Sequence, residues 1–518
     1  MPMWLSELLE NMPMWLNNLL PILILLVVVA IVLVRLPKVK EVEHSKAYRR
    51  RRVLNWLPLG LTYAFLYMGR YNLSVSKRVF EHITNSNGEQ LMTSADFATI
   101  FGVGTMVYGC AFLINGPLTD RFGGRKAILA AAGGAAFANI VMAAITWVVY
   151  YHGPGSDAVG NHFVVLFSVI YAANMYFQSF GAVAIVKVNA PWFHVRERGV
   201  FGAIFGILIS LGIYFAYDWS HQILSFFGAD PELHDATARL PWVFAAPACL
   251  LIAMCICSAI WVKNTPGEAG YRDFDSGDVS SGDDGPQLGA AQVLKLMFRS
   301  PIVMTIACVE FCSGFLRQSL MQWYQTFAKH TNDQLGNMDG FVFKNFGLLL
   351  CIAGILGGMV AGIISDHLFQ SRRGPVASIL YGGMLAGSVV LLFAYKSPAV
   401  GWIAVIMSLF VIGVHGMLSG TASMDFGGKK NVGIAVGIID GFVYAGTAAM
   451  ALTYGLLLPK EELNDVGKIV GPSTEASNWI AWPAAMIPVS IIGLLLATRV
   501  WNAKPQPRKP ATETTAPT

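Results

Sequence analysis

Long, uncharged apolar stretches recur along the whole chain and are separated by short polar connections. Most of them have roughly the 17 to 25 residues that a helix needs to cross the hydrocarbon core of a bilayer. Only helices and closed barrels can span that core, because every backbone polar group must be paired there. These stretches are continuously apolar and do not alternate with polar residues, which favours helices over barrel strands. The pattern therefore predicts an all-α membrane protein.

Thirteen segments have this character: 19–35, 53–74, 93–117, 125–150, 161–189, 198–221, 240–262, 301–328, 340–366, 375–396, 398–424, 431–458 and 476–501. A stretch rich in glycine, serine and aspartate, 264–290, has the composition of a flexible linker and divides the last twelve segments into six and six. We therefore expect an extra N-terminal transmembrane helix with a basic cytoplasmic linker (1–52), an N-terminal six-helix half (53–263), a cytoplasmic central loop (264–300), a C-terminal six-helix half (301–502) and a disordered tail (503–518).

The composition excludes a soluble globular protein. The chain is 55% hydrophobic and only 13% charged, whereas soluble proteins carry about 25% charged residues. All seven cysteines lie in apolar segments, so we interpret them as small buried hydrophobes and not as disulfides or metal ligands. The sequence shows no nucleotide-binding loop and no cluster of metal ligands. We therefore expect no cofactor, no metal, no nucleic-acid partner and no enzymatic activity.

Lysine and arginine are distributed unequally over the connections. If the stretch 35–52 is cytoplasmic, most of the chain's 36 basic residues fall on the cytoplasmic side, as the positive-inside rule requires. The C-terminus then lies in the cytoplasm and the N-terminus outside. The first segment is followed, not preceded, by basic residues, so we expect an uncleaved anchor, with a cleaved leader as the alternative. A bacterial inner membrane is the expected location, because no organelle-targeting signal is recognisable.

Two arginines interrupt apolar segments, Arg70 in GRYNLSV and Arg317 in GFLRQSL. Burying an arginine in a membrane costs several kcal/mol unless something pairs with it. No acidic residue lies within one turn of either; Glu310 precedes Arg317 by about 10 Å of helix. A guanidinium is planar and always charged, which suits bidentate binding of phosphate. We therefore predict that the two arginines bind a ligand anion; the alternative is that Arg70 ends a short helix and reaches the interface.

Aromatic residues share the helix faces that carry these arginines. Tyr63 and Tyr67 lie on the face of Arg70 at helical spacing, and Tyr324 lies on the face of Arg317. Tyrosine offers a hydroxyl group and an apolar ring, both of which suit an organic phosphate. These three tyrosines are therefore further candidates for substrate binding.

An internal repeat relates the two sets of six segments. The loop GPLTDRFGGRK (116–126) follows the second segment of the first set, and GIISDHLFQSRRG (362–374) takes the same place in the second. The spacing between their aspartates equals that between the two arginines to within one residue, which indicates duplication. Glycine allows close helix approach, and the charged residues can form a network that latches the halves in one conformation; the alternative is an ordinary basic loop. The candidate latch residues are Gly116, Asp120, Arg121, Gly124, Arg125, Asp366, Arg372 and Arg373.

The loop motif resembles the signature loop of the major facilitator superfamily. Together with YAFLYMGRYNL, APWFHVRERG, NTPGEAG, GFLRQSLMQWY and GGKKNVGIAVGIIDGFVYAG, it makes residues 48–501 similar to the organophosphate:phosphate antiporter family, which includes bacterial glycerol-3-phosphate and hexose-phosphate transporters. The resemblance implies the major facilitator fold, with two six-helix halves related by pseudo-two-fold symmetry. It also implies a phosphate held between Arg70 and Arg317, with family tyrosines at Tyr63, Tyr67, Tyr108 and Tyr444.

The sequence departs from the glycerol-3-phosphate transporters at several of their signature positions. Gly206 and Ile209 stand where that subgroup has asparagine and histidine, and Tyr71 and Phe112 stand where it has lysines. We therefore expect the phosphate clamp to be kept and the rest of the cavity to differ, so that the substrate is another phosphorylated metabolite.

Three further ionisable residues lie at membrane depth. An acidic residue inside a membrane is functional by default, so Glu310 and Asp440 are candidates for balancing the arginine charge or coupling a proton. We interpret the lone His415 as structural.

The sequence thus favours a monomeric secondary transporter that exchanges an organophosphate for inorganic phosphate across the bilayer by alternating access. Two alternatives remain open: a proton-coupled organic-anion symporter, and a transporter-like sugar-phosphate sensor.

Overall fold

The computed structural model describes residues 45–80, 83–84, 90–151, 156–225, 233–279, 289–460, 462–463 and 469–504, with the isolated positions 23 and 27. The extra helix predicted at 19–35 lies almost wholly outside the described residues. So do residues 280–288 of the central loop and nearly all of the tail predicted at 503–518.

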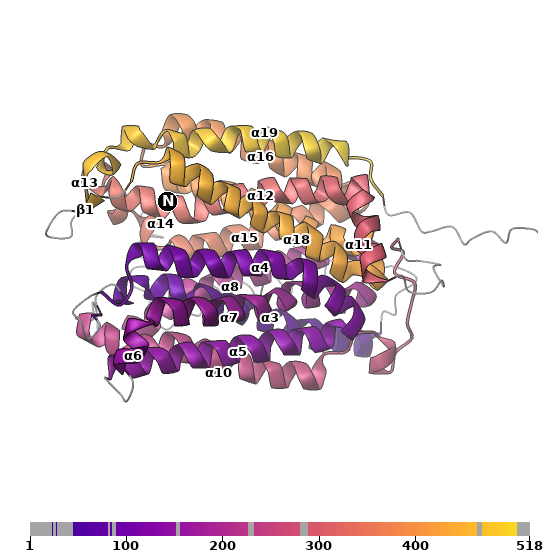
Figure 1. Ribbon diagram of the computed structural model, residues 1–518. Coiled ribbons are helices and arrows are strands. Elements are labelled where there is room, and N and C mark those ends of the chain that lie inside the picture. The colour runs from indigo at the N-terminus through magenta and orange to yellow at the C-terminus, as the bar shows by residue number, and fades with distance from the viewer. Residues whose placement is uncertain are drawn as a thin grey trace, which may run out of the picture.

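Twelve long helices dominate the described chain, and each overlaps one of the twelve segments predicted between 53 and 501 (Figure 1). The earlier six are α3 (Lys46–Phe80), α4 (Ser94–Phe122), α5 (Gly124–Tyr150), α7 (Phe163–Asn189), α8 (Arg198–Tyr214) and α10 (Leu233–Trp261). The later six are α12 (Pro301–His330), α15 (Phe346–Ile363), α16 (Arg373–Ala394), α17 (Val400–His415), α18 (Ser423–Leu457) and α19 (Ala481–Arg499).

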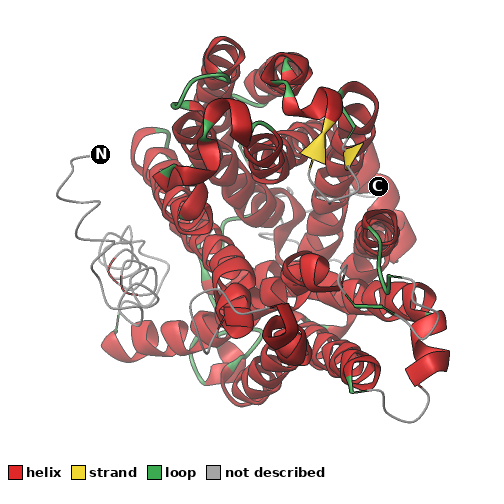
Figure 2. Ribbon diagram, turned by 90° about the vertical axis from the view of Figure 1, so that its left-hand side faces the viewer, coloured by secondary structure: helices red, strands yellow, loops and turns green. Residues whose placement is uncertain are grey.

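Short elements join or extend these helices. π-helical turns extend α8, α15 and α17: η3 (Phe215–Trp219), η6 (Ile364–Leu368) and η7 (Gly416–Ala422). The short helices are α6 (Ser156–Asn161), α9 (Ser220–Ser225), α11 (Ala290–Arg299), α13 (Asn332–Leu335) and α14 (Phe341–Lys344). Strands β1 (Glu462–Leu463) and β2 (Ile469–Val470) pair antiparallel at one end of the bundle, as Figure 2 shows in a view largely along the helices.

Eight helical stretches of the described residues are long and apolar enough to cross a membrane, or nine if the bent pair α11 and α12 counts as one span. The run from Val400 to Leu457 counts there as one stretch, although it contains α17, η7 and α18. Large apolar side chains such as Phe393 and Leu456 are more than four-fifths exposed. Exposure of this kind is unfavourable in water and natural in lipid, so the outer surface fits a bilayer.

Two hydrophobic cores fill the bundle. One is built almost entirely from residues between Tyr48 and Val262, and the other from residues between Val293 and Ala497. In Figure 1 the indigo-to-magenta helices and the orange-to-yellow helices accordingly lie as two layers, one above the other.

Glycines let helices of the two layers approach closely. A Cβ atom on Gly116 of α4 would lie 2.6 Å from the carbonyl oxygen of Gly433 in α18. Similarly, a Cβ on Gly206 of α8 would lie 3.3 Å from the Cα of Gly358 in α15. Close approach of this kind needs a residue without a side chain. These helix pairs therefore form the contact between the two halves.

Candidate functional site

Arg70 is buried in the middle of α3 and donates hydrogen bonds from all three guanidinium nitrogens. Nε donates to Oε1 of Gln178 at 3.0 Å, Nη1 to the hydroxyl of Tyr444 at 3.0 Å, and Nη2 to the hydroxyl of Tyr108 at 2.7 Å. The guanidinium also lies 4.7 Å from the ring centroid of Tyr67, within the range of a cation–π contact. Its hydrogen-bond acceptors are an amide and two hydroxyls, so no carboxylate of the described residues is bonded to it.

A buried amide network holds this part of α3 in place. Asn174 Nδ2 donates to the carbonyl of Gly69 at 2.8 Å, and the Tyr171 hydroxyl donates to the carbonyl of Arg70 at 2.9 Å. Gln178 Nε2 donates to Asn174 Oδ1 at 3.0 Å, which orients the Gln178 oxygen toward Arg70. These α7 residues were missed from the sequence, because amides inside an apolar segment carry no motif.

Arg317 is buried in α12, a helix of the later six. Its guanidinium makes no hydrogen bond or ion pair with any described residue, and Nε is buried without a partner. The groups within electrostatic range of it include Tyr67, Tyr444, Tyr71, Glu310 and Asp440. Three of these, Tyr67, Tyr444 and Tyr71, also interact with Arg70. The structure therefore brings the two predicted arginines, one from each half, to one cluster of tyrosines.

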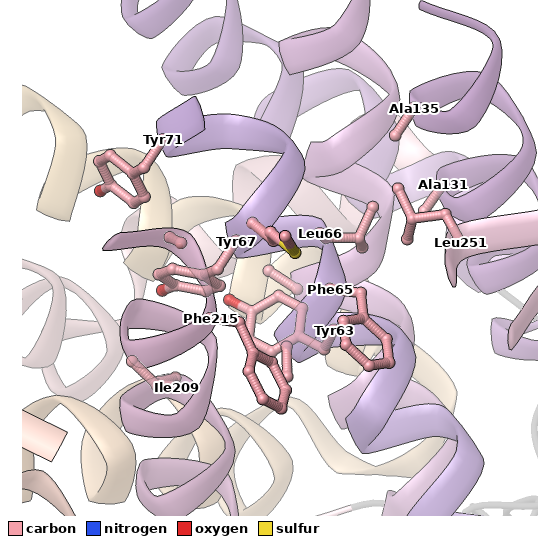
Figure 3. Close-up of a cluster of buried hydrophobic side chains, with 14 of the residues drawn as sticks. Tyr63, Phe65, Leu66, Tyr67, Tyr71, Ala131, Ala135, Ile209, Phe215 and Leu251 are labelled. Atoms are coloured by element: carbon pink, nitrogen blue, oxygen red, sulfur yellow. The ribbon is translucent and has the colours of Figure 1, made fainter. Parts of the chain in front are cut away.

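The tyrosines near Arg70 form two groups, and the predicted Tyr324 lies apart from both. Tyr63, Tyr67 and Tyr71 follow one another along α3 (Figure 3), and the rings of Tyr63 and Tyr67 meet edge to face at 5.4 Å. Tyr108 and Tyr444 meet at 4.5 Å across the two halves. Tyr324, by contrast, packs its ring 4.7 Å from Phe346, inside the C-terminal core. The described contacts of Tyr324 do not join it to either arginine, because its face of α12 turns toward α15.

Glu310 and Asp440 lie close to Arg317 but are bonded to other groups. Glu310 Oε2 lies 2.9 Å from Nδ1 of His415, and both side chains are buried. Asp440 Oδ1 accepts a hydrogen bond from Ser419 Oγ at 2.5 Å. His415 therefore belongs to an acidic cluster beside Arg317, a role that its position in an apolar segment did not indicate.

Asp120 joins the two halves at the end of the bundle expected to be cytoplasmic. It pairs with Lys187 at 2.5 Å and accepts the backbone N–H groups of Gly433 at 3.0 Å and Ile434 at 2.9 Å. Gly428 (φ 64°) and Asn431 break the helical backbone of α18 just before this point. The break leaves N–H groups without an intrahelical acceptor, and such groups attract a carboxylate.

A second network crosses the halves through Asp425. Its carboxylate accepts from Arg198 Nη1 at 3.0 Å and from Arg373 Nε at 3.0 Å, and all three side chains are buried. Arg373 also pairs with Asp366 at 2.9 Å, and Arg198 pairs with Asp278 of the central loop at 2.8 Å. Together, Asp120, Lys187, Arg198, Asp278, Asp366, Arg373 and Asp425 form what we call the inter-half latch.

Only some of the predicted latch residues contact the other half. Asp120, Gly116 and Arg373 do. Gly124 packs against Val188 within its own half, and Arg125 donates to the carbonyl of Ala259. Arg121 is exposed and lies 5.9 Å from the ring of Phe122, while Arg372 donates to Asn502. Lys187, Arg198 and Asp425 were missed, although basic residues at helix ends were a visible signal for the first two.

The central loop differs from the flexible linker that its composition indicates. Asp278 and Ser276 are buried, and Ser276 Oγ donates to Asp278 Oδ2 at 2.7 Å. The Ser276 carbonyl accepts the N–H of Val195 at 2.9 Å. Residues 276–278 therefore pack against the bundle, which their polar composition did not indicate, because composition does not show that a carboxylate has an arginine partner on another helix.

Comparisons with known proteins agree with this architecture. Residues 59–451 match the model of the Major Facilitator Superfamily. A glycerol-3-phosphate transporter of Bacillus subtilis is 24% identical over 491 residues, which cover 90% of this chain and 96% of the relative. A membrane sensor protein, UhpC of Salmonella typhimurium, is 23% identical over 79% of this chain and 85% of its own. These relatives are consistent with the organophosphate:phosphate antiporter family that the motifs indicated.

The solved structures show the same fold. The Escherichia coli fucose:proton symporter FucP aligns over 86% of this chain and 99% of its own, with a TM-score of 0.60 and 11% sequence identity. The prediction of an all-helical protein with the major facilitator fold is thereby confirmed. The chain therefore belongs to the Major Facilitator Superfamily and, as predicted, is a multi-pass membrane transporter and not an enzyme.

Proposed function

We propose that this protein transports an organophosphate across the membrane in exchange for inorganic phosphate. The observation that carries the proposal is the convergence of Arg70 and Arg317, from opposite halves, on the tyrosines Tyr67 and Tyr444. A ligand bound there touches both halves at once. Such a site is what alternating access requires, because the halves rock about it.

The electrostatics of the site favour a phosphate group. Arg70 is bonded only to neutral acceptors, and Arg317 has no hydrogen-bond partner among the described residues. A buried guanidinium left without a bonded partner costs about 1–3 kcal/mol or more. A phosphate offers several acceptor oxygens and matches the forked donors of both arginines. Binding therefore removes a penalty that the protein alone carries.

Aromatic rings surround this clamp where the glycerol-3-phosphate subgroup has charged residues. Tyr71 stacks on Tyr217 at 5.8 Å, and Phe112 stacks on Tyr444 at 5.9 Å. Rings bury apolar and sugar-like surface better than lysines do. A glycerol-3-phosphate transporter is among the relatives, which supports a phosphorylated substrate. Because aromatic rings replace the charged residues, we assign this chain a substrate with a larger organic part, such as a sugar phosphate.

In this structure the latch is closed, and its position suggests how exchange proceeds. The latch closes the end of the bundle that carries the duplicated basic loops, which we assign to the cytoplasm of a bacterial inner membrane. To release a ligand inward, the halves must separate there. A bound anion gives both guanidinium groups an anionic hydrogen-bond partner and favours this change, whereas an empty site leaves them without one and disfavours it. Transport then takes the form of obligatory exchange.

The test is phosphate self-exchange in proteoliposomes loaded with inorganic phosphate. Wild type should exchange labelled phosphate rapidly, and Arg70→Lys and Arg317→Lys should lose exchange, because lysine cannot donate two parallel hydrogen bonds. Arg272→Lys, at an exposed position of the central loop, is the matched control and should exchange normally. Competition by a series of sugar phosphates would then identify the substrate. Absence of exchange in folded wild-type protein would refute the antiporter proposal.

A sensor is the second candidate, because UhpC, a membrane sensor protein, is among the relatives. A sensor would bind the same ligands through the same clamp with little flux. Phosphate-dependent thermal stabilisation without measurable exchange would favour this function over transport.

A further inference from the structure

Three buried ionisable residues beside Arg317 are not used by the phosphate clamp. They are Glu310 on α12, His415 at the end of α17 and Asp440 on α18, and each is at most 5% exposed. Buried ionisable groups inside a membrane protein are costly, and they mark ion or proton pathways more often than structural contacts.

The contacts of these residues make them one electrostatic unit. His415 Nδ1 bonds to Glu310 Oε2 at 2.9 Å, while Glu310 Oε1 is buried without a partner. Asp440 accepts from Ser419 and interacts electrostatically with His415, Glu310 and Arg317. The other titratable groups that face the cluster are Tyr381 and Cys312, near Glu310, and Tyr108 and Tyr444, near Asp440. Phenols and thiols are ordinarily neutral at physiological pH, so the charge of the cluster is set by the two acids and the histidine.

Counting charges shows what ligand binding demands of this cluster. Arg70 and Arg317 carry two positive charges, and ionised Glu310 and Asp440 carry two negative ones. A neutral His415 that donates its Nδ1–H to Glu310 adds nothing. The site is then neutral before a ligand enters. An anion would leave uncompensated negative charge in a medium of low dielectric constant, which costs several kcal/mol per charge.

We propose that Glu310, His415 and Asp440 form a proton-binding site that takes up protons from solvent whenever a phosphate-bearing anion binds. One proton compensates a monoanion, and two compensate a dianion. Each proton adds to a carboxylate oxygen or to the imidazole. Protonation weakens the attraction between the cluster and Arg317, so that the guanidinium can pair with the bound anion. Exchange of equally charged anions then moves no net protons, whereas exchange of a monoanion for a dianion moves one proton. This inference rests on the proposed phosphate site.

The test is calorimetric titration of purified wild-type protein with inorganic phosphate in two buffers that differ in ionisation enthalpy. The difference in heat gives the protons taken up per phosphate bound. At about pH 8.5 phosphate is almost entirely a dianion, since the second pKa of phosphates is near 6–7. We expect about two protons per phosphate, and an affinity that falls about 100-fold per pH unit above that point, by linkage.

Two variants and a matched control complete the design. Glu310→Gln combined with Asp440→Asn should abolish proton uptake and make phosphate binding independent of pH. Asp218→Asn removes another largely buried acid, which interacts with Tyr214 and Cys351 and not with the arginines, and it should leave the proton count unchanged. Phosphate binding by wild type with no proton uptake would overturn the proton site alone. Absence of phosphate binding would overturn the phosphate site, and the proton site with it.

Discussion

Asp425 is the point where the latch is most easily opened by one substitution. Its carboxylate receives Arg198 from one half and Arg373 from the other, each at 3.0 Å and each buried. Asp425→Asn preserves the shape of the side chain but removes its charge and turns an amide N–H₂ toward one of the two guanidiniums, because each arginine donates to a different carboxylate oxygen. We predict that this variant loses much of its closed state at the end of the bundle that carries the latch.

The magnitude follows from the burial of all three partners. The substitution weakens two buried charge-assisted hydrogen bonds, each worth about 1.5–3 kcal/mol. Arg198 keeps Asp278 and Arg373 keeps Asp366, so neither charge is left alone, and the total cost is about 3–5 kcal/mol. The two arginines become hydrated when the halves separate, so the substitution raises the free energy of the closed conformation and hardly changes that of the open one. Since 1.4 kcal/mol corresponds to a factor of ten, the open population should rise by roughly 100-fold to several thousand-fold relative to the closed one.

A buried reporter cysteine can measure this shift. Thr421 is fully buried in η7, and its hydroxyl donates to the carbonyl of Arg198 at 3.0 Å, so it is shielded while the latch is closed. In a background without the exposed Cys110 and Cys249, Thr421→Cys should react slowly with a membrane-impermeant thiol reagent. Addition of Asp425→Asn should accelerate labelling by the factor given above, up to the rate limit of the reagent.

The control is Asp273→Asn, which removes an exposed carboxylate of the central loop. It should leave the labelling rate of the reporter unchanged. Equal labelling rates in the Asp425→Asn variant and its parent, with both proteins folded, would refute the view that this carboxylate holds the halves together.

Three further outcomes follow from other contacts. Tyr444→Phe removes the hydroxyl that accepts from Arg70, so it should destabilise the ligand-free protein by about 1–3 kcal/mol in thermal unfolding, and added phosphate should restore most of the difference. Gly116→Ala places a methyl group 2.6 Å from a carbonyl oxygen of the other half, so it should slow phosphate exchange at least tenfold by preventing closure. Glu197→Gln breaks a buried pair with Arg52 at 3.1 Å, and should lower the free energy of unfolding by about 3–5 kcal/mol.

Each of these variants has an informative comparison. Gly133→Ala adds the same methyl group where no other heavy atom lies within 4 Å, so it should exchange phosphate normally. Glu268→Gln removes an exposed carboxylate and should leave stability nearly unchanged. Unaltered melting of ligand-free Tyr444→Phe would show that its hydroxyl does not support Arg70.

Much of the fold could be predicted because its cause is local. Twelve apolar segments between 53 and 501 became twelve long helices, since a chain in a bilayer must pair its backbone within each segment. Gly116 and Asp120 could be selected because a duplicated loop repeats them, and Arg70 and Arg317 because a charge inside an apolar run has no ordinary explanation.

The partners of these residues could not be predicted in the same way. Tyr324 shares the helical face of Arg317 by spacing, yet it packs on Phe346, because the rotation of α12 against its neighbours decides which part of that face meets the cavity. In the sequence His415 is a lone histidine and Gln178 belongs to no motif. Packing places Gln178 beside Arg70 and His415 beside Glu310.

The sequence by itself therefore determined which segments between 53 and 501 form long helices and that two buried arginines need a counter-charge. Only the tertiary structure decided what surrounds those arginines and that Asp278, from a polar linker, is buried against Arg198. The physical reason is that hydrophobicity and helical period act along the chain. Ion pairs and hydrogen bonds between helices instead depend on distances across it, which no local pattern records.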